Sequence, residues 1–582
     1  QECDIREIQM LRPRDIEKIE YHDAPSGKYA KDKLVVNFIT KQYRYGGYVQ
    51  ADGLQTIGYD HGDYNVATNY VKGNNSYTVF AGANYSHVDG TEAWNNENYL
   101  FTQSLFDRES YSKNSYRNHQ EYMQFRYQNQ KGKRYWVGKF TLVNLSTPRN
   151  ASSGFAREST ETDIFSNIRK KSLSPKIDLN ANLPLSKNQT LTLGVHGKYS
   201  ANSYHRLYQE QPFEAMTDED EKALWFQLSA IYNYFSQKHS LSVELFHYHD
   251  VWNADYSGNC ELWQHLWKGE SLAFFSYNFQ ASRRLSLKTR IGLDWLQYHL
   301  HGDNSFSQLS PRINTNVQYQ LNKGMLLWSF NFVNSNHGMD VINRAMIQVN
   351  SHMMEKGMPE LKKSHDINTY LYYMGRFNRL SVSAIGQFRY NHHPVTDDYY
   401  LDEANRKIVK TYSNGGNAQY YSAILALQYK LCKFANLSGD IRYNHAEVKT
   451  TWSKHNNNLT GNLGLNMFMG DFALKPYLHF GKKSLDEAAL VINKTPIDYG
   501  MSCSYSRVNL YVELLAASPF KKQEKQYWLD LPIYSYNKSI KDQTASQYAS
   551  IKVAYSFDFG RKTQKVKKDV NKNINSSLLR VE

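Results

Sequence analysis

The feature that most constrains this chain is an alternation of apolar and polar residues with a period of two, repeated over many long segments. In "YASIKVAYSFDFG", one face carries Ile551, Val553, Tyr555, Phe557 and Phe559, and the other carries small or polar residues. The same pattern recurs in "SYTVFAGANYSHV", "HSLSVELFHYHDVW" and "RLSLKTRIGLDWLQYHL". A helical period is missing from most of the chain, so the sequence predicts an all-β protein.

Strand length and composition decide which kind of β protein is expected. Strands of soluble sandwiches run to about five or six residues, whereas a strand that crosses a bilayer at a tilt needs about ten. Several alternating segments reach that length, and their ends carry Tyr and Trp, as the aromatic girdles of membrane barrels do. The chain is 14% aromatic with 46 Tyr, and it has no apolar run of about 18 residues. We therefore predict a transmembrane antiparallel β-barrel rather than a sandwich or a propeller.

Turn positions predict the number of strands. Ten short polar connections occur, at 73–75, 130–133, 186–188, 237–239, 282–284, 322–324, 378–379, 433–435, 470–471 and 507–509. Longer stretches rich in Asn, Ser, Asp and Tyr lie between them and are expected to be outer loops: 90–118, 146–170, 202–220, 337–362, 392–416 and 521–544. If both chain ends lie on the short-turn side, ten turns correspond to 22 strands. A barrel of that width needs a plug.

The first forty residues contain two strand-like runs around a turn, in "DIEKIEYHDAPSGKYAKDKLVVNFITK". This segment resembles the end of the plug domain of TonB-dependent outer-membrane receptors, where an Ile-Glu-x-Ile-Glu strand, a Pro-Ser turn, a Tyr and an Asn-x-Ile-Thr strand lead into the barrel. The matching positions are Ile16, Glu17, Ile19, Glu20, Pro25, Ser26, Gly27, Tyr29, Asn37, Ile39 and Thr40.

The end of the chain carries a second resemblance. "YSFDFGRKTQKVKK", with Tyr555, Phe557 and Phe559, is similar to the aromatic final strand and basic tail of outer-membrane barrels of Bacteroidetes-type bacteria. The two resemblances imply three parts: residues 1–41 as the end of a plug-like domain, 42–560 as the barrel, and 561–582 as a basic, disordered periplasmic tail. Such receptors carry plugs of well over a hundred residues, so we expect the remainder of the plug to precede Gln1; the alternative is a degenerate relative without a working plug.

The resemblance implies a multi-pass protein of a Gram-negative outer membrane that imports a scarce nutrient, such as a siderophore, cobalamin, a glycan or a peptide. Its implied partners are outer-membrane lipid and lipopolysaccharide, a periplasmic energy-coupling protein of TonB type, and a surface lipoprotein or other complex partner. The alternative is a non-transporting barrel that acts as a scaffold or accessory subunit. A barrel enzyme of the phospholipase or protease type is a more distant alternative.

Catalytic and metal signatures are missing from the sequence. GxSxG, HExxH and phosphate-binding GxxxxGK motifs do not occur, so we expect no enzyme and no cofactor. The four cysteines are far apart, which predicts isolated thiols.

Two loop segments could nevertheless contact a ligand. "NHHPVTDDYYLDE" places His392, His393, Asp397 and Asp398 together, where they could bind a metal or a metal chelate, but a solvated polar loop is the favoured interpretation. "CELWQHLWKG" places Trp263 and Trp267 on one strand face. They would stack on a ligand ring if that face lines the lumen, and would belong to the girdle if it meets lipid.

Net charge is +14, which in a soluble protein would suggest nucleic acid. The segment 561–582 supplies +5 of it, from seven Lys or Arg against Asp569 and Glu582. The remaining basic residues are spread along the chain rather than clustered, so no nucleic-acid partner is expected.

Overall fold

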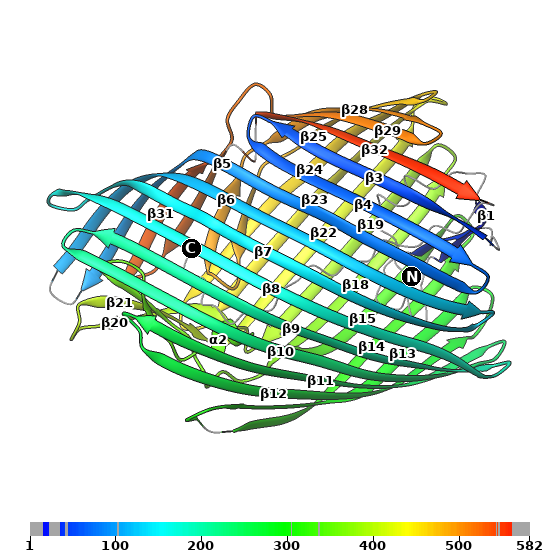
Figure 1. Cartoon of the computed structure of the whole chain (residues 1–582), viewed down its shortest axis with the longest axis horizontal. Helices are drawn as coiled ribbons and strands as arrows, with labels where there is room; N and C mark the ends of the chain where they lie inside the picture. Colours follow the sequence, from blue (N-terminus) through cyan, green and yellow to red (C-terminus); the bar gives the residue numbers. More distant parts are fainter. Residues whose placement is uncertain are drawn as a thin grey trace.

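The structure, a computed structural model, describes residues 16–22, 35–40, 45–101, 104–303, 305–335, 338–542, 544 and 547–560. These residues form a closed antiparallel β-barrel of 22 strands (Figure 1), as the turn count predicted. In pairing order the wall strands are β3 (Tyr45–Ile57), β4 (Asp60–Lys72), β5 (Asn75–Phe101), β6 (Ser104–Lys131), β7 (Arg134–Arg157), β8 (Glu161–Ser186), β9 (Gln189–Glu210), β10 (Phe213–Phe235), β11 (His239–Gly258), β12 (Leu262–Gln280), β13 (Leu285–Leu300), β14 (Phe306–Leu321), β15 (Gly324–Ser335), β18 (Ser364–Phe377), β19 (Leu380–His392), β22 (Asn417–Lys430), β23 (Ala435–Lys449), β24 (Ser453–Met469), β25 (Phe472–His479), β28 (Asp498–Arg507), β29 (Leu510–Ala517) and β32 (Tyr548–Gly560). β32 pairs with β3 and so closes the wall.

The two ends of the barrel differ. Ten turns of two to four residues join wall strands at one end, at the ten places where the sequence predicted them. The first and last wall strands also meet at this end, because Tyr45 lies opposite Lys72 and Gly560 lies opposite Gly46. We call the opposite end, which carries the longer connections, the mouth.

Three segments predicted as outer loops were wrongly assigned. Residues 90–118, 146–170 and 202–220 lie mostly within continuous strands, in β5 and β6, β7 and β8, and β9 and β10. Pairing of β5 with β6 runs from Asn75 opposite Asn129 to Phe101 opposite Ser104. β6 alone has 28 residues, which at about 3.3 Å per residue is far longer than a bilayer is thick. These strands continue beyond the apolar part of the wall, where Asn, Ser and charged residues become frequent, so their composition resembled that of loops.

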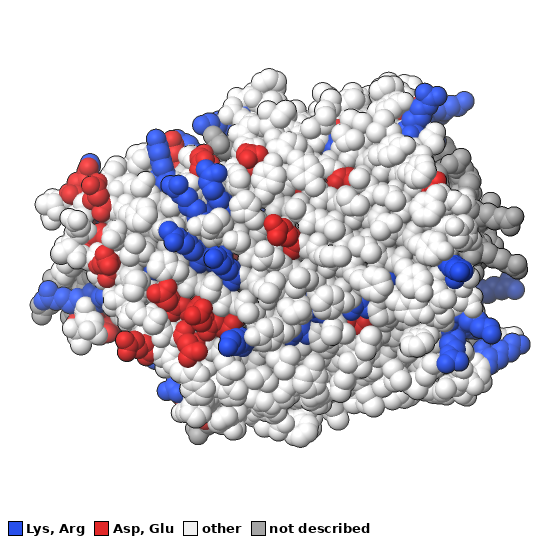
Figure 2. Space-filling view, in the orientation of Figure 1, with Lys and Arg blue, Asp and Glu red and all other residues white. Residues whose placement is uncertain are grey.

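The wall is apolar outside and polar inside. On β8, Ile177 and Leu179 are each 52% exposed, whereas Ser174 and Lys176 on the opposite face are 0% and 4% exposed. Trp136 and Trp328, close to the short turns, also have exposed side chains. Figure 2 shows a broad zone with few charges between the charged ends of the barrel. A soluble sandwich would have the reverse arrangement.

Four further strands raise the wall at the mouth: β26 (Lys482–Asp486), β27 (Val491–Thr495), β30 (Glu524–Asp530) and β31 (Tyr534–Lys541). They fill the interval between β24 and β5. Asn456 on β24 donates a hydrogen bond of 2.8 Å to the carbonyl oxygen of Lys483, and β31 pairs with residues 92–99 of β5.

A separate four-stranded sheet, which we call the inner sheet, forms from the connection between β15 and β18 and the connection between β19 and β22. Its order is β16 (Met346–Gln348), β17 (Met353–Lys356), β21 (Lys407–Ser413) and β20 (Thr396–Asp402), with β17 and β21 parallel. A short helix, α2 (Met339–Ile342), precedes β16. No described helix is long and apolar enough to cross a membrane.

Near the N-terminus, β1 (Ile16–His22) and β2 (Val35–Thr40) form a two-stranded antiparallel sheet. Ile16 lies opposite Thr40 and Glu20 lies opposite Asn37, so the two strand-like runs do pair. The turn residues Pro25, Ser26, Gly27 and Tyr29, as well as the tail 561–582, lie outside the described residues.

Candidate functional site at the mouth of the barrel

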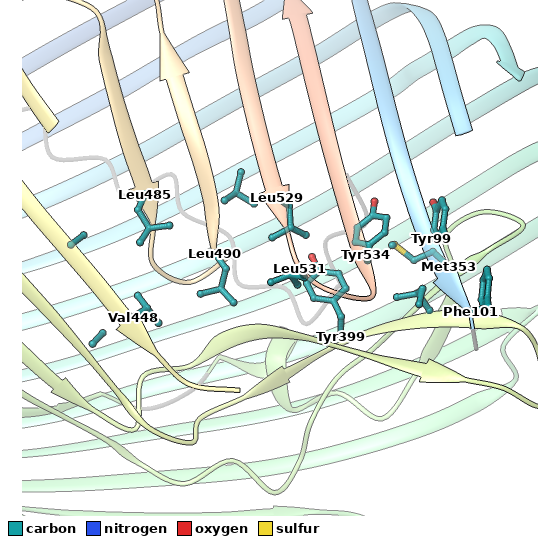
Figure 3. Packing of buried hydrophobic residues seen from close by; sticks show 14 residues of the cluster. Tyr99, Phe101, Met353, Tyr399, Val448, Leu485, Leu490, Leu529, Leu531 and Tyr534 are labelled. Carbon is teal, nitrogen blue, oxygen red and sulfur yellow. The ribbon is translucent and has the colours of Figure 1, made fainter. Parts of the chain in front are cut away.

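The inner sheet packs against the raised wall through one apolar core (Figure 3). Tyr399 of β20 and Ile408 of β21 are 6% and 0% exposed. They are buried in one cluster with Leu529 of β30, Tyr534 of β31 and Val448 of β23. The long connections are therefore folded together rather than extended separately into solvent.

On the other side, the segment that leads into and out of the inner sheet packs against the wall strands β10 to β13. Ile342 of α2 and Leu361 are buried in a cluster with Trp252, Leu266 and Leu296, which face the lumen from β11, β12 and β13. In the pairing order of the wall, these strands lie far from β23, β31 and β5, which contact the sheet from its other side. The inner sheet and its flanking segments therefore bridge the lumen at the mouth.

Polar anchors hold this bridge to the wall. Arg206 of β9 is 3% exposed and donates hydrogen bonds to the carbonyl oxygens of Gln348 (2.7 Å) and Val349 (2.5 Å). The next two residues of the connection are also bonded to the wall, since Asn350 donates to the Tyr99 hydroxyl and Ser351 donates to Glu210.

The anchoring carboxylate is itself part of a buried network. Arg108 of β6, 4% exposed, lies 2.7 Å from Glu97 and 3.0 Å from Glu210. Tyr99 and Tyr534 donate hydrogen bonds to the same oxygen of Glu97. Buried ion pairs whose hydrogen bonds are all formed hold their side chains in one conformation. The wall side chains that bond to the segment between β16 and β17 are therefore held in fixed positions.

A second charged group lies within the inner sheet. The Nζ atom of Lys410 on β21 is 3.4 Å from Glu355 on β17 and 3.3 Å from Asp397 on β20. Burial raises the pKa of both carboxyl groups, and Lys410 opposes that rise. Burial would lower the pKa of Lys410, but the attraction of Asp397 and Glu355 raises it above its ordinary value. The ammonium group of Lys410 thus stabilises the ionised forms of two buried carboxyl groups.

Of the loop residues that were considered as ligands of a metal chelate, the structure brings the rings of His392 and His393 to 3.9 Å from each other and gives Asp397 and Asp398 separate partners. His392 ends β19, while the Nδ1 atom of His393 lies 2.8 Å from the carbonyl oxygen of Asn414. Asp397 is paired with Lys410, and Asp398 accepts a hydrogen bond of 2.8 Å from the indole of Trp452. Within the described part of the chain, no three His, Cys, Asp or Glu side chains are grouped as metal ligands.

Trp263 and Trp267 lie on the outer face of β12. Trp263 is 51% exposed, whereas its neighbours Gln264 and Leu266 are buried on the lumen side. The ring of Trp263 stacks on that of His265 at 6.1 Å, and Trp267 meets His249 edge to face. This placement matches the girdle alternative, in which the indoles meet the membrane rather than a ligand in the lumen.

The aromatic residues near the C-terminus share the outer face of β32. Tyr555, Phe557 and Phe559 are 51%, 54% and 36% exposed, whereas the adjacent Ala554 and Ser556 are buried. Cys260, Cys432 and Cys503 are free thiols, and Cys3 is outside the described residues.

Sequence reasoning missed the anchors Arg206 and Lys410. A local signal existed for Arg206, because the alternation in "SYHRLYQE" puts it on the lumen face with Tyr204 and Tyr208. A cation on the inside of a long strand needs a partner. The partner, a backbone segment more than a hundred residues away, leaves no mark in the local pattern.

The outer surface of the inner sheet offers groups that can contact a ligand. Tyr400 is 44% exposed, and the turn after β20 exposes Glu403 and Arg406. On the outer face of β5, Trp94 is 40% exposed and its ring lies 4.2 Å from that of Tyr111.

Comparison with known proteins agrees with this architecture. The structure is similar to the copper transporter OprC (TM-score 0.63, 10% identity), with 94% of this chain and 87% of that chain covered. It is also similar to the siderophore receptor PirA from Pseudomonas aeruginosa (TM-score 0.57, 12% identity, 90% and 82% covered). A third neighbour is the iron transporter FrpB from Neisseria meningitidis (TM-score 0.57, 8% identity, 94% and 88% covered).

Sequence comparison adds nothing to these likenesses, since no family model and no curated protein matches the chain. At such low identity the likeness shows the fold. The neighbours are described as transporters and receptors. The fold is that of the barrels of TonB-dependent outer-membrane receptors.

Proposed function

We propose that this protein is an outer-membrane importer of a scarce nutrient, with the mouth as its ligand-binding and gating region. The observation that carries the proposal is the inner sheet, which bridges the lumen of a wide closed barrel between two sides of the wall. A barrel occluded at its mouth gains a transport function only if the occluding segment moves. Energy from a periplasmic protein of TonB type would drive the movement.

In this proposal residues 1–41 form the end of a plug-like domain. The paired strands β1 and β2 agree with that assignment. Copper, siderophores and iron appear in the names of the structural neighbours, so metal chelates are the first substrates to test.

Uptake by cells with and without the protein tests the proposal. We expect a deletion strain to lose uptake of one substrate from a panel of ferric siderophores, copper chelates, cobalamin and glycans. Dissipating the proton gradient should abolish that uptake in the parent strain. Unchanged uptake of every substrate, together with a stable partner protein in detergent extracts, would instead establish the scaffold alternative.

A disulfide across the mouth tests the gating role. The Oγ1 atoms of Thr396 on β20 and Thr450 beyond β23 are 3.3 Å apart, so Thr396→Cys with Thr450→Cys should cross-link the inner sheet to the wall. We expect oxidation to stop uptake and reductant to restore it. The matched control is Ser174→Cys with Ser200→Cys, whose Oγ atoms are 3.1 Å apart on adjacent wall strands. Cross-linking that pair should leave uptake unchanged.

A further inference from the structure

Four basic residues form a cluster on the outer wall near the mouth, over strands β6, β7 and β8. Arg117 lies directly opposite Arg149 in the pairing of β6 with β7. Arg169 faces the irregular stretch of β7 that contains Arg149, and Lys171 lies opposite Ser146. We call these four residues the basic cluster. Figure 2 shows blue side chains gathered over this part of the wall.

All four side chains point away from the lumen. Arg117 follows the same alternation as Met123 and Phe125, which are exposed, while Tyr122 and Gln124 are buried. Arg169 and Lys171 likewise share a face of β8 with exposed Leu173. Arg149 is exposed and is paired across from Arg117, so it belongs to the same face.

The cluster lies at the edge of the apolar band. Leu173, 46% exposed, is two residues from Lys171 on the outer face of β8, and the exposed Ile177 and Leu179 follow it. Two residues of strand correspond to about 7 Å. The cations therefore lie at the depth where lipid headgroups begin when the apolar band is in hydrocarbon.

A local distortion places Arg149 in the cluster. The register of β7 against β8 shifts between Thr147 and Asn150, so Pro148 and Arg149 together face Arg169. Proline has no N–H for the ladder and is tolerated in a sheet at such a bulge. Bulges redirect side chains, and here the effect is to insert a third guanidinium between two others.

Charge within the cluster is poorly balanced. Arg117 has one acidic partner, Asp89, at 3.0 Å, and within the described part of the chain Arg149, Arg169 and Lys171 form no ion pair. Further toward the mouth the pattern differs, since Arg157 is paired with Glu161 at 2.6 Å. Like charges placed directly opposite each other on a sheet destabilise it unless an anion lies between them.

We infer that the basic cluster binds the phosphate groups of an anionic, phosphorylated lipid of the outer leaflet. Guanidinium groups bind phosphate oxygens in pairs, and adjacent Arg149 and Arg169 can contact one phosphate from two strands. The acyl chains of such a lipid would lie along Leu173 and the apolar wall below it. A lipid satisfies both the charge and the adjoining apolar surface, whereas free phosphate satisfies only the charge.

Binding of lipid A to the purified full-length barrel in detergent tests this assignment. We expect Arg149→Gln with Lys171→Gln to weaken binding of phosphorylated lipid A by about tenfold or more, because contacts to charged groups are lost. The matched control, Lys133→Gln with Arg134→Gln, removes two exposed cations at the short-turn end and should leave affinity unchanged. Resistance of the folded barrel to SDS before heating checks that both variants fold.

Dephosphorylated lipid A and inorganic phosphate distinguish a site for a phosphorylated lipid from a site for free phosphate. Dephosphorylated lipid A should bind the unaltered barrel as weakly as phosphorylated lipid A binds the double variant. Equal binding of the two lipids, or an equal loss in the control variant, would overturn the assignment. Displacement of lipid A by inorganic phosphate at equal concentration would also overturn it, in favour of a simple anion site.

Discussion

Arg206 on the lumen face of β9 holds the carbonyl oxygen of Val349, 143 residues further along the chain, through a 2.5 Å hydrogen bond. A second bond from the same guanidinium reaches Gln348. One wall side chain thus fixes two consecutive peptide groups of the connection that enters the inner sheet.

Replacing this anchor should loosen the mouth without unfolding the barrel. We expect Arg206→Leu to lower the hydrogen-exchange protection of residues 346–356 by about tenfold or more, because a hydrogen bond from a charged group contributes about 1.5–3 kcal/mol. Arg157→Leu removes an exposed guanidinium from β7 and serves as the control. Unchanged protection in Arg206→Leu would show that the apolar contacts alone hold the segment.

The pairing of Lys410 with Glu355 and Asp397 makes the stability of the inner sheet dependent on pH. Without the lysine, two carboxyl groups whose pKa burial already raises would remain buried and unpaired. Breaking a buried pair in this way costs about 3 kcal/mol. We therefore expect Lys410→Met to increase hydrogen exchange in residues 396–413 at pH 7.5.

The direction in which pH changes the stability of the inner sheet follows from the difference in proton binding between its folded and opened states. A carboxyl group whose pKa is higher in the folded sheet than in the opened segment binds its proton first in the folded state. Stability of the Lys410→Met sheet should therefore rise as pH falls from 7.5 toward 5, after correction for intrinsic exchange rates. Lys407→Met on the same strand is the control, because Lys407 bonds the neutral amide of Gln348. A variant that opens further at low pH would contradict the sign.

The wall could be predicted from the sequence because the features that define its strands and turns lie within a few consecutive residues. Alternation assigns Ile177 and Lys176 to opposite faces from adjacent letters, and each short turn is recognised from a few residues. Counting those turns was enough to give the number of strands.

The mouth could not be predicted in the same way. In "ANSYHRLYQE" the alternation continues, but Ser203, His205 and Gln209 stand on the outer face in place of aliphatic residues, because this part of β9 lies beyond the apolar band. The composition resembled that of a loop, so a strand was missed. Contacts such as that of Lys410 with Glu355 join separate connections, and their pairing depends on the closed barrel bringing both to one place.

The orientation of the barrel can be tested with epitope tags. A tag inserted after Asn405, in the exposed turn between β20 and β21, should bind antibody on intact cells, because the mouth faces outward in the proposed topology. A tag between Gly470 and Asp471, in a short turn, should bind antibody only after permeabilisation. The reverse labelling would invert the topology.

The final strand provides a test of assembly. Phe557 and Phe559 point outward from β32, which pairs with both β29 and β3 and so completes the wall. Each phenyl ring contributes about 2 kcal/mol by its transfer into an apolar environment, and aspartate would also place a charge at the lipid face. We expect Phe557→Asp with Phe559→Asp to abolish the folded, heat-modifiable form in outer-membrane fractions. Phe520→Asp is the matched control, since Phe520 is 85% exposed in the connection between β29 and β30, outside the wall. Normal amounts of the folded double variant would mean that the outer face of β32 does not need to be apolar for insertion.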